Sequence, residues 1–187
     1  MKKLIFALIA GATAMGAAQA QNRPYIGAGV VSADNKFEVA GTTNRSAEGY
    51  KAGGKIFGGV EIDQNFGVEL GHADFKKADV GFTQNGVAGR GETDGRATYV
   101  AAKATAPMNE QFSFFGKLGV AHTKSKLTSA TPGISRSESD NGLYAGLGAQ
   151  YNLSQQVALT LEYERFGKTR DFGPKPDAVT VAARYNF

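Results

Sequence analysis

Hydrophobic and polar residues alternate with a period of two along most of the chain after residue 21. Alternation of this kind is typical of β-strands whose two faces meet different surroundings, and no sustained helical stripe interrupts it. The pattern predicts eight strands, with the bounds Pro24–Ala33, Tyr50–Ile62, Phe66–Phe75, Arg96–Ala106, Gln111–Thr123, Asn141–Tyr151, Gln156–Phe166 and Ala178–Phe187.

The connectors between these segments are of two kinds, which alternate along the chain. Three are tight turns, at positions 63–65, 107–110 and 152–155. Four are long polar loops of mixed charge, at Asp34–Gly49, Lys76–Gly95, Lys124–Asp140 and Gly167–Asp177. This alternation predicts an all-β fold, an eight-stranded antiparallel up-and-down meander that closes into a barrel.

One face of the predicted strands is continuously apolar, and the other mixes glycine, small residues and single charges of both signs. A soluble lipocalin-like barrel would turn the apolar face inward, whereas a transmembrane barrel would turn it toward lipid. The glycine-rich face suits a crowded interior, and aromatic residues on the apolar face gather near the tight turns, as in an interfacial girdle. They are Phe66, Phe112, Tyr151, Tyr185 and Phe187. We therefore predict a transmembrane barrel, although Arg96–Ala106 leaves its own two faces ambiguous.

The first twenty residues have the pattern of a secretory signal peptide. MKK is a positive n-region, an apolar stretch follows it, and Ala18-Gln19-Ala20 is a small-x-small cleavage site. The apolar stretch is short and diluted for a spanning helix, which needs about 20 strongly apolar residues. We expect cleavage between Ala20 and Gln21, which leaves one exported barrel domain at 21–187 of 187 − 20 = 167 residues.

Charge and composition narrow the possible functions further. Removing Lys2 and Lys3 with the signal lowers the net charge from +4 to +2, without the concentrated basic patch that nucleic-acid binding requires. The chain has no cysteine, which excludes disulfides, zinc-thiolate sites and a lipobox anchor. Twenty-five glycines and ten per cent aromatic residues fit a β-rich fold with many turns.

The sequence resembles the OmpA-like eight-stranded outer-membrane barrels over nearly all of the mature chain. The stretches that carry the resemblance are YKAGGKIFGGVEIDQNFGVELGHADF, AAKATAPMNEQFSFFGKLGVAHTKS, GLYAGLGAQYNLSQQVALTLEYERFG and the terminal VAARYNF. The resemblance implies a monomeric surface or anchor protein in the outer membrane of a Gram-negative bacterium. It also implies that the assembly machinery reads Tyr185 and Phe187, and that the long loops contact surface ligands. Because the chain ends with the last strand, we expect no peptidoglycan-binding domain.

Charged residues on the polar face are the candidate site. The resemblance places family interior charges at Glu69, Lys103, Lys117 and Glu162, and strand parity adds Lys55 and Arg184. Counting from the tight-turn end of each strand predicts that Glu69 pairs with Lys103 across one ladder. Gln150 and Thr160 stand where the family has an interior glutamate and arginine, so the family's gating pair is incomplete.

Two functional alternatives to a packed, salt-bridged plug remain open. One is a polar ion pathway, which would make the barrel a small porin-like channel; eight strands leave an interior just wide enough for side chains. The other is a lipid-modifying enzyme, for which His72 and His122 are the only histidines. Neither histidine lies in a nucleophile pattern, and the sequence has no cofactor or metal motif. Lys168, Arg170 and Lys175 are candidates for contacts with lipopolysaccharide phosphates.

Overall fold

The computed structural model describes residues 22–37, 43–47, 51–84, 87–129, 136–167 and 172–187. It contains nine strands and, within these ranges, no helix that is long and apolar enough to span a membrane. The strands are β1 (Arg23–Phe37), β2 (Thr43–Ala47), β3 (Lys51–Glu61), β4 (Phe66–Gln84), β5 (Val87–Pro107), β6 (Phe112–Ser129), β7 (Arg136–Asn152), β8 (Val157–Phe166) and β9 (Phe172–Asn186).

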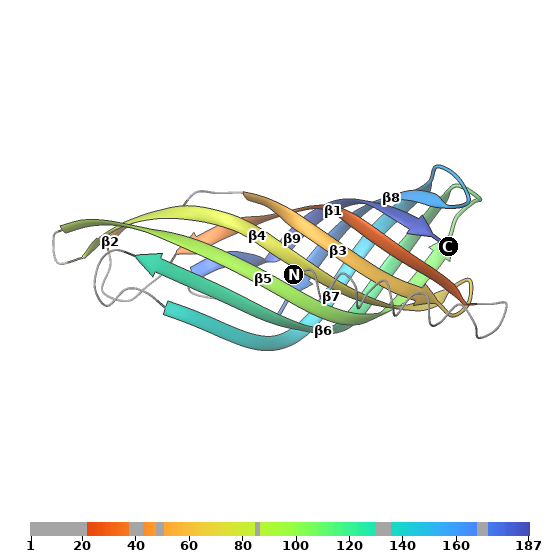
Figure 1. The fold of residues 1–187 in the computed structure, drawn as a ribbon, viewed down its shortest axis with the longest axis horizontal. Coiled ribbons are helices and arrows are strands. Elements are labelled where there is room, and N and C mark those ends of the chain that lie inside the picture. Colours follow the sequence, from red (N-terminus) through yellow and green to blue (C-terminus); the bar gives the residue numbers. More distant parts are fainter. Residues whose placement is uncertain (1–21, 38–42, 48–50, 85–86, 130–135, 168–171) are drawn as a thin grey trace.

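Eight of these strands form a closed antiparallel ring (Figure 1), which confirms the predicted meander. Each strand pairs with the next along the chain, and β1 pairs with β9 to close the barrel. The additional strand, β2, lies outside the ring and, among the described strands, pairs with the far part of β4, where Thr43 faces Thr83.

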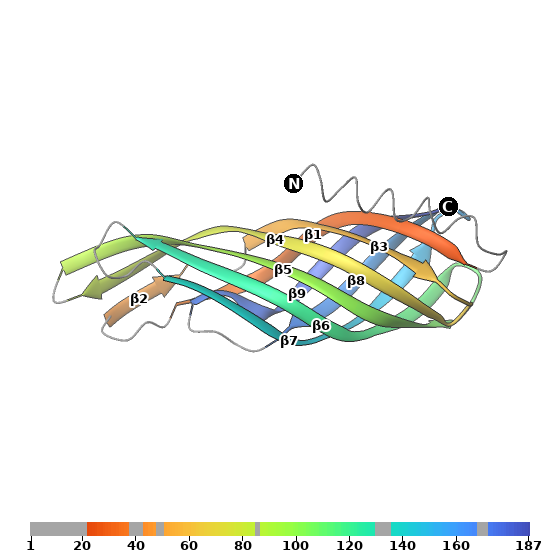
Figure 2. The ribbon, with the colours of Figure 1, turned by 60° about the horizontal axis from the view of Figure 1, so that its bottom comes forward.

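The strands on one side of the ring continue far beyond the rest of the barrel (Figures 1 and 2). β4 and β5 stay paired as far as Gln84 and Val87, so most of the predicted loop Lys76–Gly95 is an extended hairpin. β6 and β7 likewise stay paired into the predicted loop Lys124–Asp140. The prediction that the strands end before these long polar loops was wrong there, because strand pairing needs ladder hydrogen bonds and not apolar side chains. We call this end of the barrel the extended end.

The apolar face of the strands lies on the outside of the barrel. Leu147 is 71% exposed, Phe66 is 61% exposed and Val100 is 45% exposed, whereas Tyr99 and Lys103 are buried in the interior. This arrangement confirms the transmembrane orientation, excludes the lipocalin-like reading and settles the two faces of β5. The exposed apolar residues of the strands form a band that we call the apolar belt, and they include Val68, Leu70, Val100, Leu118, Val120, Leu147, Leu161 and Val181.

At the opposite end, which we call the turn end, three similar tight turns connect neighbouring strands. Asp63, Asn109 and Ser154 each use a side-chain oxygen to accept hydrogen bonds from the backbone N–H groups two and three residues later. These bonds satisfy donors that the tight turn withdraws from the ladder. Both ends of the described barrel meet here, since the Phe187 N–H donates to the Pro24 carbonyl at 3.0 Å.

Glycines on the inner face make room for interior aromatic rings. A Cβ atom on Gly71 would overlap the Tyr99 ring, and one on Gly27 would overlap the Phe57 ring. The glycine-rich polar face of the sequence is therefore required by the close approach of these rings.

Candidate functional site in the barrel interior

A cluster of five charged side chains fills the middle of the barrel, and we call it the central cluster. It consists of Lys55 on β3, Glu69 on β4, Lys117 on β6, and Glu162 and Glu164 on β8. The Lys117 ammonium lies 2.7 Å from Glu69 Oε1 and 2.8 Å from Glu162 Oε1. The Lys55 ammonium lies 3.0 Å from Glu162 Oε2 and 2.5 Å from Glu164 Oε1.

Hydroxyl groups satisfy the remaining oxygen atoms of these carboxylates. Tyr25 and Tyr99 donate to the two oxygens of Glu69 at 2.9 Å and 2.5 Å. Tyr144 donates to Glu164 Oε1 at 2.6 Å, and Thr180 donates to the other oxygen of Glu164. Buried carboxylates are stable only with such partners, so the cluster is built as one hydrogen-bonded unit.

A second group of side chains lies nearer the turn end, and we call it the turn-end cluster. Arg184 Nη2 lies 2.7 Å from Glu61 Oε1, and the Lys103 ammonium lies 3.4 Å from the same oxygen. Arg184 also donates to Gln150 Oε1 at 3.1 Å through Nη1 and to Asn186 Oδ1 at 2.7 Å through Nε. Lys103, Gln150 and Arg184 are buried, whereas Asn186 and Glu61 keep some contact with solvent, and the Glu61 side chain is 17% exposed.

Aromatic rings separate and cap the two clusters. The Arg184 guanidinium lies 3.7 Å from the centroid of the Tyr25 ring, whose hydroxyl reaches Glu69 in the central cluster. Toward the extended end, the Tyr99 and Tyr144 rings stack at 4.0 Å, and Phe166 packs against both. The interior is thus occupied by charged pairs between layers of rings.

Charge is balanced over the two clusters together. The cations are Lys55, Lys103, Lys117 and Arg184, and the carboxylates are Glu61, Glu69, Glu162 and Glu164. The central cluster has one excess carboxylate (2 − 3 = −1), and the turn-end cluster has one excess cation (2 − 1 = +1). Neutrality limits the electrostatic cost of holding eight charges in a narrow barrel.

The structure places all six sequence-predicted interior charges in these clusters, but the predicted pairing of Glu69 with Lys103 is wrong. The count assumed that Phe66 lies level with Ala106, whereas Phe66 faces Ala104, a stagger of two residues. Glu69 therefore faces Ala101, and the small alanine leaves room for Lys117 to reach Glu69 from the next strand. Lys103 is displaced toward the turn end and meets Glu61.

Several participants were not among the predicted site residues. Glu61 and Glu164 share the inner face of their strands with predicted residues, so parity alone could have added them. Tyr25, Tyr99 and Tyr144 donate to the buried carboxylates, and nothing in the sequence pattern distinguishes these tyrosines from ordinary core aromatics. The positions that depart from the family pattern lie side by side, because Gln150 faces Thr160 across β7 and β8. Arg184 on β9 bonds Gln150 at this place.

The remaining predicted residues lie outside the interior or outside the described ranges. Tyr185 and Phe187 lie on the outer surface at the turn end. On the outer surface too, His72 Nδ1 lies 2.8 Å from Thr98 Oγ1, and His122 Nδ1 lies 2.7 Å from Asn141 Oδ1. The cleavage-site residues Ala20 and Gln21 and the loop residues Lys168 and Arg170 fall outside the described residues, as does the Lys175 side chain. No metal-binding group of three or more His, Cys, Asp or Glu residues occurs in the described part of the chain.

Comparisons with known proteins agree with this architecture. A comparison with curated protein sequences finds no match. Among solved structures, Ail, the attachment invasion locus protein of Yersinia pestis, is 23% identical with a TM-score of 0.60, covering 90% of this chain and 100% of that chain. OprG from Pseudomonas aeruginosa is 17% identical with a TM-score of 0.62, and the match covers 90% of this chain and 97% of OprG. Neisserial surface protein A is 14% identical with a TM-score of 0.57, and the match covers 88% of this chain and 97% of that protein.

These structural likenesses establish a shared fold. The family profile described as outer membrane protein beta-barrel domain matches residues 4–187, which is nearly the entire chain. The chain therefore belongs to the outer membrane protein beta-barrel domain family.

Proposed function

We propose that this outer-membrane barrel is a closed, non-enzymatic anchor that presents an extended β surface outside the cell. The observation that carries the proposal is the interior, where the central and turn-end clusters and their rings occupy the space an ion would need. An eight-stranded barrel has room inside for little more than its own side chains. A passing ion would have to break several buried pairs at once, which is costly when one partner is left alone.

The alternative of a small porin-like channel is favoured by the alternation of both charge signs along the interior. Conductance in planar lipid bilayers separates the two functions. We expect the purified wild-type barrel to show, at most, small and irregular conductance events. Replacing Tyr99 and Tyr144 together by alanine removes the stacked rings and should increase conductance, whereas Leu147→Ala on the outer surface should not. Large, stable channels from the wild-type protein would refute a closed barrel.

The backbone pairing on the outer surface supports the absence of enzymatic activity. Within the described residues, the arrangement that comes nearest to a nucleophile beside a base is Thr98, which faces His72 and His122 in register. Backbone N–H groups at these positions lie within continuous antiparallel ladders, which use such groups for strand pairing. Acyl transfer needs free donors that stabilise an oxyanion, and a paired strand does not supply them.

The surface role is supported by the strands beyond the apolar belt. The extended end contains β2 and the far parts of β4, β5, β6 and β7, which build a continuous β surface (Figure 2). Ail of Yersinia pestis has been solved in complex with the heparin analogue sucrose octasulfate. By analogy, the loops at 34–49, 76–95, 124–140 and 167–177, with the strands found in them, are the part of this chain proposed to meet surface ligands.

Export and assembly complete the proposal. Residues 1–20 act as the signal peptide, cleaved between Ala20 and Gln21, and the mature barrel works as a monomer. The outer-membrane assembly machinery reads Tyr185 and Phe187, whose side chains lie together on the outer surface with ring centroids 5.2 Å apart. The turn end faces the periplasm, and the extended end faces outward.

A further inference from the structure

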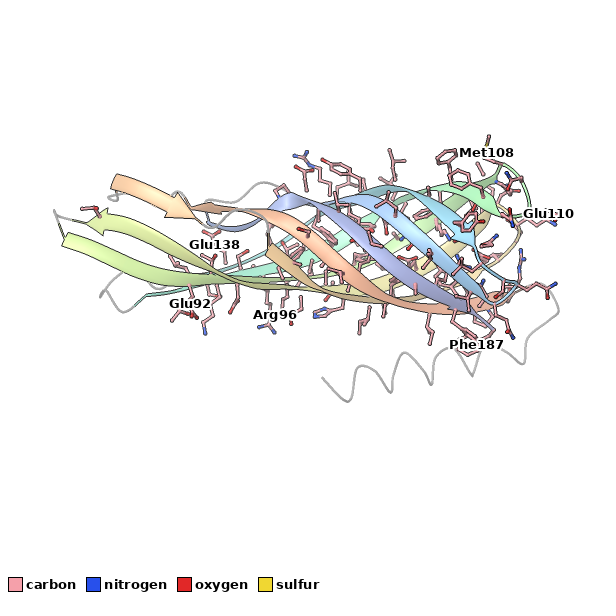
Figure 3. All side chains as sticks on the ribbon, turned by 90° about the horizontal axis from the view of Figure 1, so that it is seen from above. Glu92, Arg96, Met108, Glu110, Glu138 and Phe187 are labelled. Carbon is pink, nitrogen blue, oxygen red and sulfur yellow. The ribbon has the colours of Figure 1, made fainter. Side chains whose placement is uncertain are left out.

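Two cations face each other on the outer surface of the barrel, just beyond the apolar belt at the extended end. Arg96 on β5 lies directly opposite Lys124 on β6, and both side chains are exposed. Figure 3 shows Arg96 on the outside of the wall. Facing residues bring their Cβ atoms within about 5 Å, and like charges in that position repel. An anion between the two cations would offset this repulsion.

Another cation near this border, Arg165, differs in having an ion-pair partner. Arg165 on β8 forms an ion pair with Asp177 at 3.4 Å. Lys126, one pleat beyond Lys124, faces Asp94 in register but forms no ion pair with it within the described residues. Within the described residues, neither Arg96 nor Lys124 forms an ion pair, although Asp74 faces Arg96 from the other side, on β4. Arg96 and Lys124 are thus left available to an external anion.

The height of the pair matches the boundary of a bilayer. Along β5, Arg96 lies ten residues from Ala106 at the turn end (106 − 96 = 10). A strand tilted by about 40° climbs about 2.5 Å per residue, so ten residues span about 25 Å, the height of the apolar band of such barrels. The next outward residues toward the membrane are Thr98 and His122, followed by Val100 and Val120 in the apolar belt.

We propose that Arg96 and Lys124 bind the phosphate groups of a glycolipid in the outer leaflet, the chemistry of lipopolysaccharide. The acyl chains lie along Val100 and Val120, the sugar backbone lies beside Thr98 and His122, and the phosphate lies between the two cations. Placement directly above the apolar belt selects a lipid over a soluble anion, because a soluble anion needs no adjoining apolar surface. The site rests on the proposed orientation, with the extended end outside.

The test measures lipid A binding to the purified barrel in detergent micelles by native mass spectrometry. The probes are bisphosphorylated lipid A and the same lipid after removal of its phosphates. At about 1 kcal/mol per cation near an anionic surface, Arg96→Gln and Lys124→Gln should each weaken binding about fivefold, and the double variant about 25-fold. Arg165→Gln, at the same border but already ion-paired, is the matched control and should stay within about twofold of wild type.

Two further variants keep the test independent of folding. Arg96→Lys combined with Lys124→Arg preserves both charges and should retain binding. Asp74→Asn removes the facing carboxylate and should strengthen binding. Equal binding of dephosphorylated lipid A, unchanged binding by the double glutamine variant, or displacement of the lipid by millimolar inorganic phosphate would overturn the site. Because both ends of the barrel are accessible in micelles, failure here is distinct from failure of the proposed orientation or of the closed barrel.

Discussion

A buried charge in a narrow barrel is held by whichever partner its side chain can reach. Glu69 receives three bonds, from Lys117, Tyr25 and Tyr99. Lys103, by contrast, has one long contact to Glu61 and otherwise lies near the faces of the Tyr25 and Phe115 rings. Removing one partner of a buried pair leaves the other charge uncompensated, so Glu69 and Lys117 should depend strongly on each other.

Coupling between Glu69 and Lys117 is therefore expected in a double-mutant cycle. Glu69→Gln and Lys117→Met should each lower the free energy of unfolding in urea by about 3 kcal/mol, since each strands a buried charge. Their double variant should recover about 1–3 kcal/mol of the summed loss. Glu69→Gln combined with Lys103→Met is the matched control and should be nearly additive. Stronger coupling to Lys103 than to Lys117 would contradict the observed pairing.

The identity of the interior charges follows from the sequence, but their pairing does not. Period-two parity placed Glu69 and Arg184 on the polar face, because a strand turns every second side chain to the same side. The family resemblance placed Lys103 there, since the parity of its own strand was ambiguous. Pairing depends on the stagger between neighbouring strands, which barrel closure sets for the whole ring. The stagger of two residues between β4 and β5 moved Lys103 away from Glu69, and no local pattern reports it.

Backbone hydrogen bonding determines where a strand ends, whereas the apolar alternation in the sequence ends at the border of the apolar belt. Apolar alternation stops near the border of the apolar belt, and the predicted strand Phe66–Phe75 ends there. β4 nevertheless continues to Gln84, after a register shift between Phe75 and Ala78. Beyond the border both faces of a strand can meet water, so the hydrophobic contrast that reveals a strand is lost.

The last strand, β9, carries the proposed assembly signal. Phe187 is 63% exposed, and its deletion removes one backbone hydrogen bond, to the Pro24 carbonyl, so the stability of a barrel refolded in detergent should fall only slightly. In cells, deleting Phe187 should reduce folded protein in the outer membrane and leave periplasmic aggregate, measured by fractionation and by gel mobility without boiling. Val179→Ala, which trims the same outer face of β9, should assemble normally. Equal assembly of all three proteins at strong expression would count against a terminal signal.

At the scale of the whole molecule, the two ends of the barrel are built differently. The turn end consists of tight turns closed by Asp63, Asn109 and Ser154, with both ends of the described barrel beside them (Figure 1). The extended end carries long paired strands with polar side chains. The alternation of short and long connectors along the sequence predicted this asymmetry, and only the regular pairing within the long connectors was not predicted.

Orientation in the membrane follows from that asymmetry and can be tested with single cysteines, because the chain has none of its own. Asn85→Cys follows Gln84, the last residue of β4, in the sequence, and Met108→Cys lies in a turn where the native residue is 64% exposed. A membrane-impermeant maleimide should label Asn85→Cys on intact cells. It should label Met108→Cys only after the outer membrane is permeabilised, because the tight turns face the periplasm. The two variants control for each other, since both thiols must react fully in detergent. The reverse labelling pattern would mean that the barrel is inserted in the opposite orientation. Arg96 and Lys124 would then lie at the inner leaflet, away from lipopolysaccharide.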